Sequence, residues 1–509
     1  MVESTAGERI IVIGAGMGGL ALAARLAKHG YSVDVYEKNA SAGGRVAQTK
    51  VKGYTIDLGP TFLLMPQEFE ELFAYCGNDI HDFVQYEPLS PLYRLHYWDG
   101  THLDVHSSLP EMKKELERYD SPRAETNFQG FLDFLTHEQE KYPVIYNRFI
   151  ARPAGSLLRL IFSSDFPKLF QLDGFHSMWE NADQFFSNPK LNLAFSFQSM
   201  YVGESPFVAP GTYSIIPFVE LTQGVWYPTQ GMNGLVNAVE TLAKKMGATI
   251  HYKKQVNEII IENGQAKGIR LASGKEERAS LVISNLDLPA TYAKLVPSPH
   301  RKKYSDEKLK KLKYGCSAFM LYLGVDQDYS QLQHHNVFFS ENYTQNFREI
   351  FDQRIIPSEL SLYVNVPTRT NPKLAPKGKH LLYVLVPVPY SAKKEGEVID
   401  WNHYKNEFMH TILDTLEKNG LTDLKKHIKM TKLFTPSDWE QLAGMHVGST
   451  FGLSPIFLQS SVFRPQQRSE EIGNLYFVGA STHPGSGMPM VLISARTAEK
   501  LIQDDRKRK

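Results

Sequence analysis

The sequence contains little cysteine and no continuously apolar segment of membrane-spanning length. Its two cysteines, Cys76 and Cys316, have no partner at the spacing of a metal or redox motif. We therefore expect two buried or incidental thiols in a reducing compartment. The uncharged stretches 221–239 and 474–495 are interrupted by glycine, proline, asparagine or glutamine, so neither predicts a membrane-spanning helix. The apolar run near the amino terminus is too short for a secretory signal and is typical of a strand.

An excess of charge of either sign is also absent. Lysine and arginine number 56 and aspartate and glutamate number 55, which gives no electrostatic reason to expect nucleic-acid binding. By contrast, 42% of the residues are hydrophobic and 12% are aromatic, enough to form large cores and to line an apolar pocket. A chain of 509 residues exceeds the usual size of one core, so we expect two or three compact units.

The first pattern that carries chemistry is a βαβ unit. Residues 8–13 predict a strand, 17–29 a helix and 32–38 a second strand. The turn into the helix carries the pattern GxGxxG, with glycines Gly14, Gly16 and Gly19. The first glycine permits a tight turn, the second lets the backbone approach a pyrophosphate, and the third lets the helix pack on the strand. Glu37, at the end of the second strand, is placed to bind a ribose diol, so the unit predicts a dinucleotide site.

A second glycine segment follows directly. In NASAGGRVAQT, Gly43, Gly44 and Arg45 are unlike a typical dehydrogenase continuation and are typical of flavoproteins with two dinucleotide-binding domains. We expect Arg45 near the pyrophosphate and the two glycines close to the isoalloxazine end of a flavin. An ordinary glycine loop with a surface arginine is the alternative. Further on, VAQTKVKGYTIDLGP predicts two short strands that end in a turn at Gly59 and Pro60.

A third segment, GASTHPGSGMP at residues 479–489, lies about 460 residues after the first. A strand is predicted to end at Val478 and Gly479, and a helix to start near Gly487. The amides at the start of that helix would face the pyrimidine edge of a flavin, where they stabilise negative charge by roughly 0.3–1 kcal/mol. The glycine-rich segments at opposite ends of the chain therefore predict that one long cofactor is held at both of its ends.

The intervening chain changes pattern several times. Residues 105–225 are helical, aromatic and interrupted, and 231–285 predict a helix, a strand, a hairpin and a further strand. Strand-like runs dominate 314–390, and 402–418 predicts a helix. No repeat and no low-complexity segment is present.

Several stretches spread over essentially the full length carry a family resemblance. They are GAGMGGLALAARLAKHGYSVDVYEKNASAGGR, GYTIDLGPTFLLMP, LAFSFQSMYVG, CSAFMLYLGVD and FVGASTHPGSGMPMVLISA. With these stretches the chain closely resembles the bacterial-type carotenoid (phytoene) desaturase family, and within it the dehydrosqualene desaturases, which act on 4,4'-diapophytoene. One departure is Gln230, where many relatives carry a second glycine.

The resemblance implies an FAD-dependent enzyme that removes hydrogen pairs from a long linear apolar carotenoid precursor and extends its conjugation. It implies an α/β fold: a Rossmann-like FAD-binding domain of the two-dinucleotide-binding-domain type, a mixed β-sheet substrate domain and a helical, membrane-facing insert. The FAD-binding domain is expected in three parts, with the insert and the substrate domain between them. In chain order the expected ranges are 1–95 (FAD), 96–225 (insert), 226–300 (FAD), 301–465 (substrate) and 466–509 (FAD).

The motifs and the resemblance together give a set of expected FAD-binding residues: Gly14, Gly16, Gly18, Gly19, Glu37, Lys38, Gly43, Gly44, Arg45, Gly59, Pro60, Val256, Gly479, Gly487 and Met488. No metal ligand is expected. Candidates for a general base are His483, in the flavin turn, and Glu220, which flanks the GVWYP segment. Catalysis by carbocation stabilisation on flavin and aromatic faces, with no dedicated base, is an equal alternative.

An apolar substrate suggests contact with a membrane. The segment 155–172, GSLLRLIFSSDFPKLFQL, combines leucines and phenylalanines with Arg159 and Lys168 and predicts an interfacial helix. A core helix of the substrate domain is the alternative. We expect a cytoplasmic protein bound peripherally to the inner face of the cell membrane, with quinone or oxygen as the electron acceptor.

Other activities on the same fold remain open at this point. A carotenoid terminal-methyl oxidase, a polyene isomerase using reduced FAD, an amine or protoporphyrinogen oxidase and a non-enzymatic flavin or carotenoid carrier share these motifs. The sequence does not separate thirty-carbon from forty-carbon substrates, and it does not give the number of desaturation steps.

Overall fold

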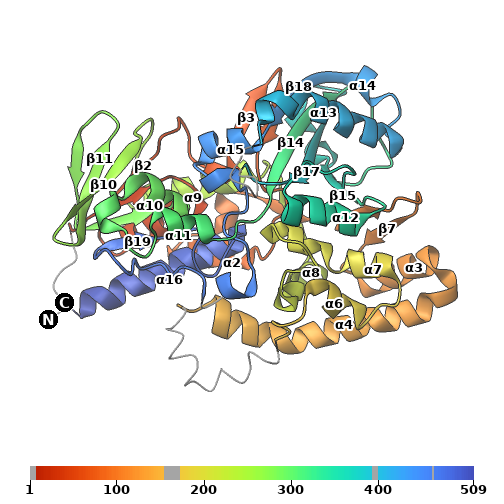
Figure 1. Cartoon of the computed structure of the whole chain (residues 1–509), viewed down its shortest axis with the longest axis horizontal. Helices are drawn as coiled ribbons and strands as arrows, with labels where there is room; N and C mark the ends of the chain where they lie inside the picture. Colours follow the sequence, from red (N-terminus) through yellow and green to blue (C-terminus); the bar gives the residue numbers. More distant parts are fainter. Residues whose placement is uncertain (1–6, 154–171, 392–398, 461–462, 509) are drawn as a thin grey trace.

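The computed structural model describes residues 7–153, 172–391, 399–460 and 463–508. Two main sheets organise this part of the chain. In Figure 1 the smaller, parallel sheet and its helices lie on the left, the larger sheet lies at the upper right, and a helical region lies below it.

The smaller sheet has five parallel strands in the order β19-β13-β1-β2-β9. Their bounds are Leu475–Phe477, Leu281–Ser284, Arg9–Ile13, Ser32–Tyr36 and Thr249–His251. The central strand β1 is a continuous apolar run because both of its faces are covered. Ile10 and Val12 point to one core, and Ile11 and Ile13 point to another.

Different layers cover the two faces of this sheet. On one face helix α1 (Met17–Lys28) packs between α9 (Asn233–Lys245) and α16 (Met488–Lys507). On the other face lies a three-stranded antiparallel sheet of β10 (Val256–Glu262), β11 (Gln265–Leu271) and β12 (Glu276–Arg278). Alanines and glycines on α1 let its two neighbours approach closely, and this brings the amino-terminal and carboxy-terminal helices together.

The larger sheet has seven strands in the order β18-β14-β17-β16-β15-β6-β7. Their bounds are Ile428–Phe434, Ser317–Val325, His380–Val388, Leu362–Asn365, His335–Phe338, Tyr93–His96 and His102–Val105. Neighbouring strands are antiparallel except β15 and β6. One face packs on helix α13 (Trp401–Lys418), and the other packs on the hairpin of β3 (Gln48–Val51) and β4 (Tyr54–Asp57).

The helical region is built from α3, α4, α6, α7 and α8, with bounds Leu109–Tyr119, Ala124–Val144, Met178–Asp183, Pro189–Ala194 and Ile215–Gln223. Helix α4 runs along the lower edge of the molecule in Figure 1 and continues into one π-helical turn at Ile145–Ile150. No helix within the described ranges is long and apolar enough to cross a bilayer.

Most of the predicted elements are confirmed, with shifts of a few residues at their ends. The βαβ unit, the two short strands, the strand-rich stretch and the helix at 402–418 are all present. Both cysteines are buried. The expected boundary between the first FAD-binding part and the insert, at residue 96, lies at the end of β6. Both β6 and β7 belong to the larger sheet and not to the helical region. The predicted interfacial helix at 155–172 lies outside the described residues, except for Leu172.

Candidate cofactor and substrate site

One cavity of about 1320 Å³ reaches all three glycine segments. Its wall is formed by the carboxyl ends of β1 and β2, by β14, β16 and β17 of the larger sheet, and by the helical region. Small-molecule sites usually measure about 300–1,000 Å³, so this cavity has room for more than one ligand of ordinary size. Ligands of open parallel sheets bind at the carboxyl ends of the strands, where this cavity begins.

The first glycine segment leaves its backbone open to the cavity. Gly14 has φ +94°, and its N–H donates to the carbonyl of Tyr36 at 2.8 Å, which ties the start of the turn to the end of β2. A Cβ on Gly16 would lie 2.5 Å from Nδ2 of Asn285, and Gly18 also lines the cavity. Gly19 does not line it. A Cβ there would lie 2.4 Å from the carbonyl of Gly14, so Gly19 allows α1 to pack against the turn.

Glu37, the residue predicted to bind the ribose, is fixed in place by backbone hydrogen bonds. Glu37 is buried, and its two carboxylate oxygens accept the N–H of Ala15 at 2.9 Å and that of Asn39 at 2.8 Å. Lys38 and Val256 line the same end of the cavity. Burial lowers the pKa of Lys38, the nearby carboxylate of Glu37 raises it, and Lys294 lowers it further.

The second glycine segment brings a cation into the wall. Gly43 and Gly44 have φ values of +124° and +56°, which favour glycine. Nη2 of Arg45 donates to Oδ2 of Asp287 at 2.7 Å. A Cβ on Gly59 would lie 1.8 Å from the carbonyl of Arg45, so the turn at Gly59 and its neighbour Pro60 can pass this closely only without a side chain. All of these residues line the cavity.

The third glycine segment forms another part of the cavity wall. Gly479 and Gly487 have φ values of +114° and +110°, and α16 begins at Met488, as predicted. Beside this turn lies Arg464, which lines the cavity and is 2% exposed. Its Nη2 donates to the carbonyl of Ala480 at 2.7 Å, while its Nε has no hydrogen-bond partner among the described residues. Burial lowers the pKa of Arg464. A buried cation without a carboxylate of its own suits an anionic group.

The groups that line this end of the cavity match those that bind a flavin dinucleotide. The wall offers open glycine backbone, the buried carboxylate of Glu37, the two guanidinium groups of Arg45 and Arg464, and the start of α16. A dinucleotide needs backbone amides and cations for its phosphates and an acid for its ribose. The donor set fits this requirement.

The cavity continues as an apolar arm into the helical region and along the larger sheet. Its lining there is aliphatic and aromatic: Phe62, Leu64, Met65, Tyr142, Ile145, Phe149, Phe197, Tyr201, Phe339, Tyr343, Phe347, Leu362 and Leu385. Such a wall offers dispersion contacts and no charge. The arm therefore suits a long apolar molecule.

The two candidate bases do not line the cavity. The ring Nε2 of His483 lies 2.9 Å from the carbonyl of Arg152, and the residue is 1% exposed. Glu220, on α8, is fully buried behind Tyr201, which does line the cavity. Burial raises the pKa of Glu220 to about 8. The catalytic roles of both residues stay predictions.

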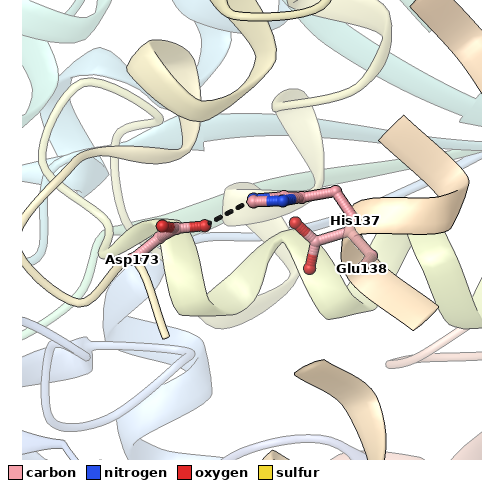
Figure 2. Close-up of side chains that lie close together, drawn as sticks. All are labelled: His137, Glu138 and Asp173. Carbon is pink, nitrogen blue, oxygen red and sulfur yellow. Dashed lines mark hydrogen bonds and ion pairs between the residues drawn. The ribbon is translucent and has the colours of Figure 1, made fainter. Parts of the chain in front are cut away.

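A cluster of possible metal ligands lies outside the cavity lining. Figure 2 shows the carboxylate of Asp173 facing the ring of His137, with Glu138 alongside. Their ligand atoms lie within 4.8 Å of one another. The ammonium of Lys141 donates to His137 and to Asp173 and lies 3.3 Å from Oε1 of Glu138. The ammonium group of Lys141 therefore occupies the position that a metal ion would take. The cluster links α4 to the chain at Asp173.

Sequence reasoning missed three residues of the site. Asn285 and Asp287 follow β13 directly, and Asn285 contacts the positions where Gly16, Gly18 and Gly479 would carry side chains. Their place at the carboxyl end of a parallel strand is a signal that could have found them. Arg464 stands in an irregular segment and carries no such signal.

The parallel sheet, the glycine turns, the buried carboxylate and the two guanidinium groups of this cavity are the features of a dinucleotide-binding flavoprotein. The sequence pattern of the flavin-containing amine oxidoreductase family matches residues 17–501, so the chain belongs to this family. It is an FAD-dependent oxidoreductase. It is 39% identical to a zeta-carotene-forming phytoene desaturase of Myxococcus xanthus, over 99% of this chain and 95% of that protein.

Two further relatives act, by name, on a different precursor. A 4,4'-diapophytoene desaturase (4,4'-diapolycopene-forming) of a Methylomonas species is 38% identical, over 97% of this chain and 95% of that protein. A 4,4'-diapophytoene desaturase (4,4'-diaponeurosporene-forming) of Staphylococcus aureus strain Newman is 35% identical, over 97% and 99%. The resemblance to the carotenoid desaturases is thus confirmed, while 39% and 38% identity do not separate the two precursors.

Solved structures agree on the fold. An oxidoreductase from Methanosarcina mazei matches with a TM-score of 0.57 and 20% identity, over 97% of this chain and 100% of that chain. Putrescine oxidase bound to putrescine matches with a TM-score of 0.60 and 14% identity, over 98% and 99%. At these identities the likeness concerns the fold alone.

Proposed function

We propose that this chain is an FAD-dependent desaturase that dehydrogenates a long linear carotenoid precursor, either 4,4'-diapophytoene or phytoene. The observation that carries the proposal is the apolar arm, which continues without a break from the glycine segments of the cavity. An amine substrate calls for acceptors or carboxylates along its path, and the arm offers aliphatic and aromatic side chains. The names of the relatives support the same substrate class.

The residues of the cavity divide the work of holding the cofactor. Glu37 would accept hydrogen bonds from the ribose, and the glycine turn, Arg45 and Arg464 would hold the phosphates. The start of α16 would stabilise negative charge on the flavin. The remaining members of the proposed FAD site line the same wall or, in the case of Gly19, support the turn. When bound, FAD would accept one proton and two electrons from the substrate together, as a hydride. The apolar arm positions the polyene and excludes water.

A membrane is the proposed source of the substrate. Phe175, Phe457, Leu458 and Phe463, here called the apolar patch, are exposed, with Leu458 at 69% and Phe175 at 63%. The rings of Phe175 and Phe457 are 5.2 Å apart, and those of Phe457 and Phe463 are 5.8 Å apart. Because Phe457 and Phe463 also line the cavity, the patch is continuous with the apolar arm.

Positive charge lies next to the apolar patch. The N–H of Lys313 donates to Oε1 of Gln459, one residue beyond Leu458, and Lys313 ends the basic run KLKKLK at 308–313. Anionic lipid attracts each such residue by about 1 kcal/mol. We propose that the patch enters an anionic bilayer together with segment 155–172, on the inner face of the cell membrane, and that quinone or oxygen reoxidises the flavin.

Anaerobic mixing tests the proposed activity. The FAD-loaded protein is mixed with liposomes that carry 4,4'-diapophytoene or, separately, phytoene. New long-wavelength absorbance together with bleaching of the flavin is the expected result, and the faster of the two substrates identifies the precursor. A polar oxygenated product in air would point to a terminal-methyl oxidase. An isomerised product without net oxidation would point to an isomerase. Either result would overturn the proposal.

A further inference from the structure

A carboxyl group without a charged partner lies behind the apolar arm. Glu220 on α8 is 0% exposed, and its Oε2 accepts the hydroxyl of Tyr93, on β6, at 3.2 Å. The oxygen of Tyr93 in turn accepts Nε2 of Gln198 at 3.0 Å. Gln198 belongs to the 3-10 helix η6 (Phe197–Val202). An unpaired carboxylate is costly in such a place, so this residue needs a reason to be there.

Tyr201 connects this carboxyl group to the cavity. It lies on η6, it lines the apolar arm, and it lies close enough to Glu220 to lower the pKa of that carboxyl group. Its hydroxyl and Oε1 of Glu220 are both buried with no hydrogen-bond partner among the described residues, so each is free to bond to the other. Its ring centroid is 5.0 Å from that of Phe62, two residues beyond Pro60 in the proposed flavin-binding turn. The phenol therefore stands between the buried carboxyl group and the part of the cavity where the flavin end is proposed to lie.

The surroundings of Glu220 raise its pKa to a value near neutral pH. Burial is the largest influence on its pKa and raises it, while the polar groups of Tyr201, Tyr93 and Gln198 nearby lower it and offset burial only partly. Of these, the hydroxyl of Tyr93 donates a hydrogen bond to the carboxyl group. These three groups, from η6 and β6, are the titratable or hydrogen-bonding neighbours that act on it, and none carries a charge. The resulting pKa of about 8 lets the carboxyl group both lose and regain a proton near neutral pH.

We propose that Tyr201 and Glu220 form the proton-accepting site of the desaturation, an inference that rests on the proposed function. Forming one C=C bond breaks two C–H bonds on adjacent carbons. One hydrogen leaves as the hydride that FAD accepts, and the other leaves as a proton while its bonding electrons become the new π bond. That proton passes to the oxygen of Tyr201 as the phenol proton passes to the carboxylate of Glu220. Tyr201 is the catalytic residue, and Glu220 acts through it.

A second buried base stands near the same wall but is less suited. Nδ1 of His335 lies 2.6 Å from the hydroxyl of Tyr363, which lies 2.7 Å from Oγ1 of Thr61. Burial lowers the pKa of His335 well below its usual value. Protonation there would create a cation in apolar surroundings, whereas protonation of the Glu220 carboxylate removes a charge. The structure therefore favours Glu220.

Two substitutions and a pH profile test the assignment. In the native holoenzyme, kcat/KM on liposome-borne polyene should fall about tenfold per pH unit below an apparent pKa near 8, because the base must be ionised. Glu220→Gln and Tyr201→Phe should each lower the rate at pH 8 by about 100-fold or more and abolish this slope. The control is Glu204→Gln, which alters a second buried carboxyl group that does not line the cavity and should leave the slope intact.

A spectroscopic readout separates this proposal from the proposed function. Infrared difference spectra of the FAD-loaded protein, recorded without substrate, should show a protonated carboxyl band that disappears with a midpoint near pH 8 and is absent in Glu220→Gln. If no polyene is turned over by the native protein, the proposed function fails, whatever this band does. If native turnover occurs while Tyr201→Phe keeps its rate and slope, or Tyr363→Phe loses them instead, the assignment to Tyr201 and Glu220 is overturned.

Discussion

At the scale of single residues, Gly16 lines the cavity in the dinucleotide turn and has no room for a side chain. A Cβ there would lie 2.5 Å from Asn285, and the larger side chain of valine would fill the space meant for a pyrophosphate. Gly16→Val should therefore abolish FAD binding, measured as flavin absorbance per protein after purification with added FAD. Ala272→Val, which places a valine at an exposed position, should keep full occupancy. A fully loaded Gly16→Val protein would place the cofactor elsewhere.

Glu220 also predicts how stability depends on pH. Its pKa is raised in the folded state, so the folded protein holds this proton more tightly than the unfolded chain does. Its contribution to the free energy of unfolding is therefore lost as pH rises from about 4.5 to about 8, and it is constant above that. The loss is on the order of a few kcal/mol.

Glutamine cannot ionise, so the substitution removes this dependence. The melting temperature of Glu220→Gln minus that of the native protein should increase from pH 5 to pH 8. The exposed substitution Glu262→Gln should show no such trend. A flat difference for Glu220→Gln would mean that the native carboxyl group is ionised, contrary to its surroundings.

At the scale of elements, local patterns explain what the sequence could predict. The βαβ unit, the turn at Gly59 and the start of α16 each depend on glycines and apolar spacing within about ten residues, and each is found as expected. β6 joins β15, which lies more than 200 residues further along, and no local pattern encodes such a pairing. Arg464 was missed for the same reason, since only the folded chain brings it beside Ala480.

The short helix that carries Phe457 and Leu458 predicts where the protein meets lipid. Phe457→Ser combined with Leu458→Asp should weaken cosedimentation with anionic liposomes and reduce turnover of liposome-borne substrate, because the apolar patch loses its insertion. Turnover of detergent-dispersed substrate and FAD content should stay native. Ile355→Asp changes a comparably exposed apolar residue elsewhere and serves as the matched control.

Segment 155–172 can be compared in the same assay. Leu158→Asp combined with Phe162→Asp should weaken liposome binding if that segment shares the contact, as the sequence predicts. Native binding by the Phe457 and Leu458 variant would exclude the apolar patch as a docking surface. Loss of binding with both neutral and anionic liposomes, but only in the patch variant, would assign the contact to the patch rather than to the segment.

At the scale of the whole molecule, the proposed FAD site is enclosed by segments from both ends and the middle of the chain, so we expect FAD to be held without a covalent bond. No cysteine lies in the turn 479–489, and the buried His483 does not line the cavity. Acid precipitation, which unfolds all of these segments together, should release the yellow colour completely into the supernatant. Flavin retained on the washed pellet would show a covalent link, and mass spectrometry of the flavin peptide would then identify the residue.

Most neighbouring strands of the parallel sheet are synthesised far apart in time. The strand at the sheet's edge, β19, is synthesised about 460 residues after β1. At about 5–20 residues per second, roughly half a minute to a minute and a half of synthesis separates the two. During that interval α1 lacks the cover of α16, and β13 has an open edge from its own synthesis until β19 follows. The nascent chain therefore exposes apolar surface until β19 and α16 have been synthesised, and the cavity that would hold the cofactor is complete only then.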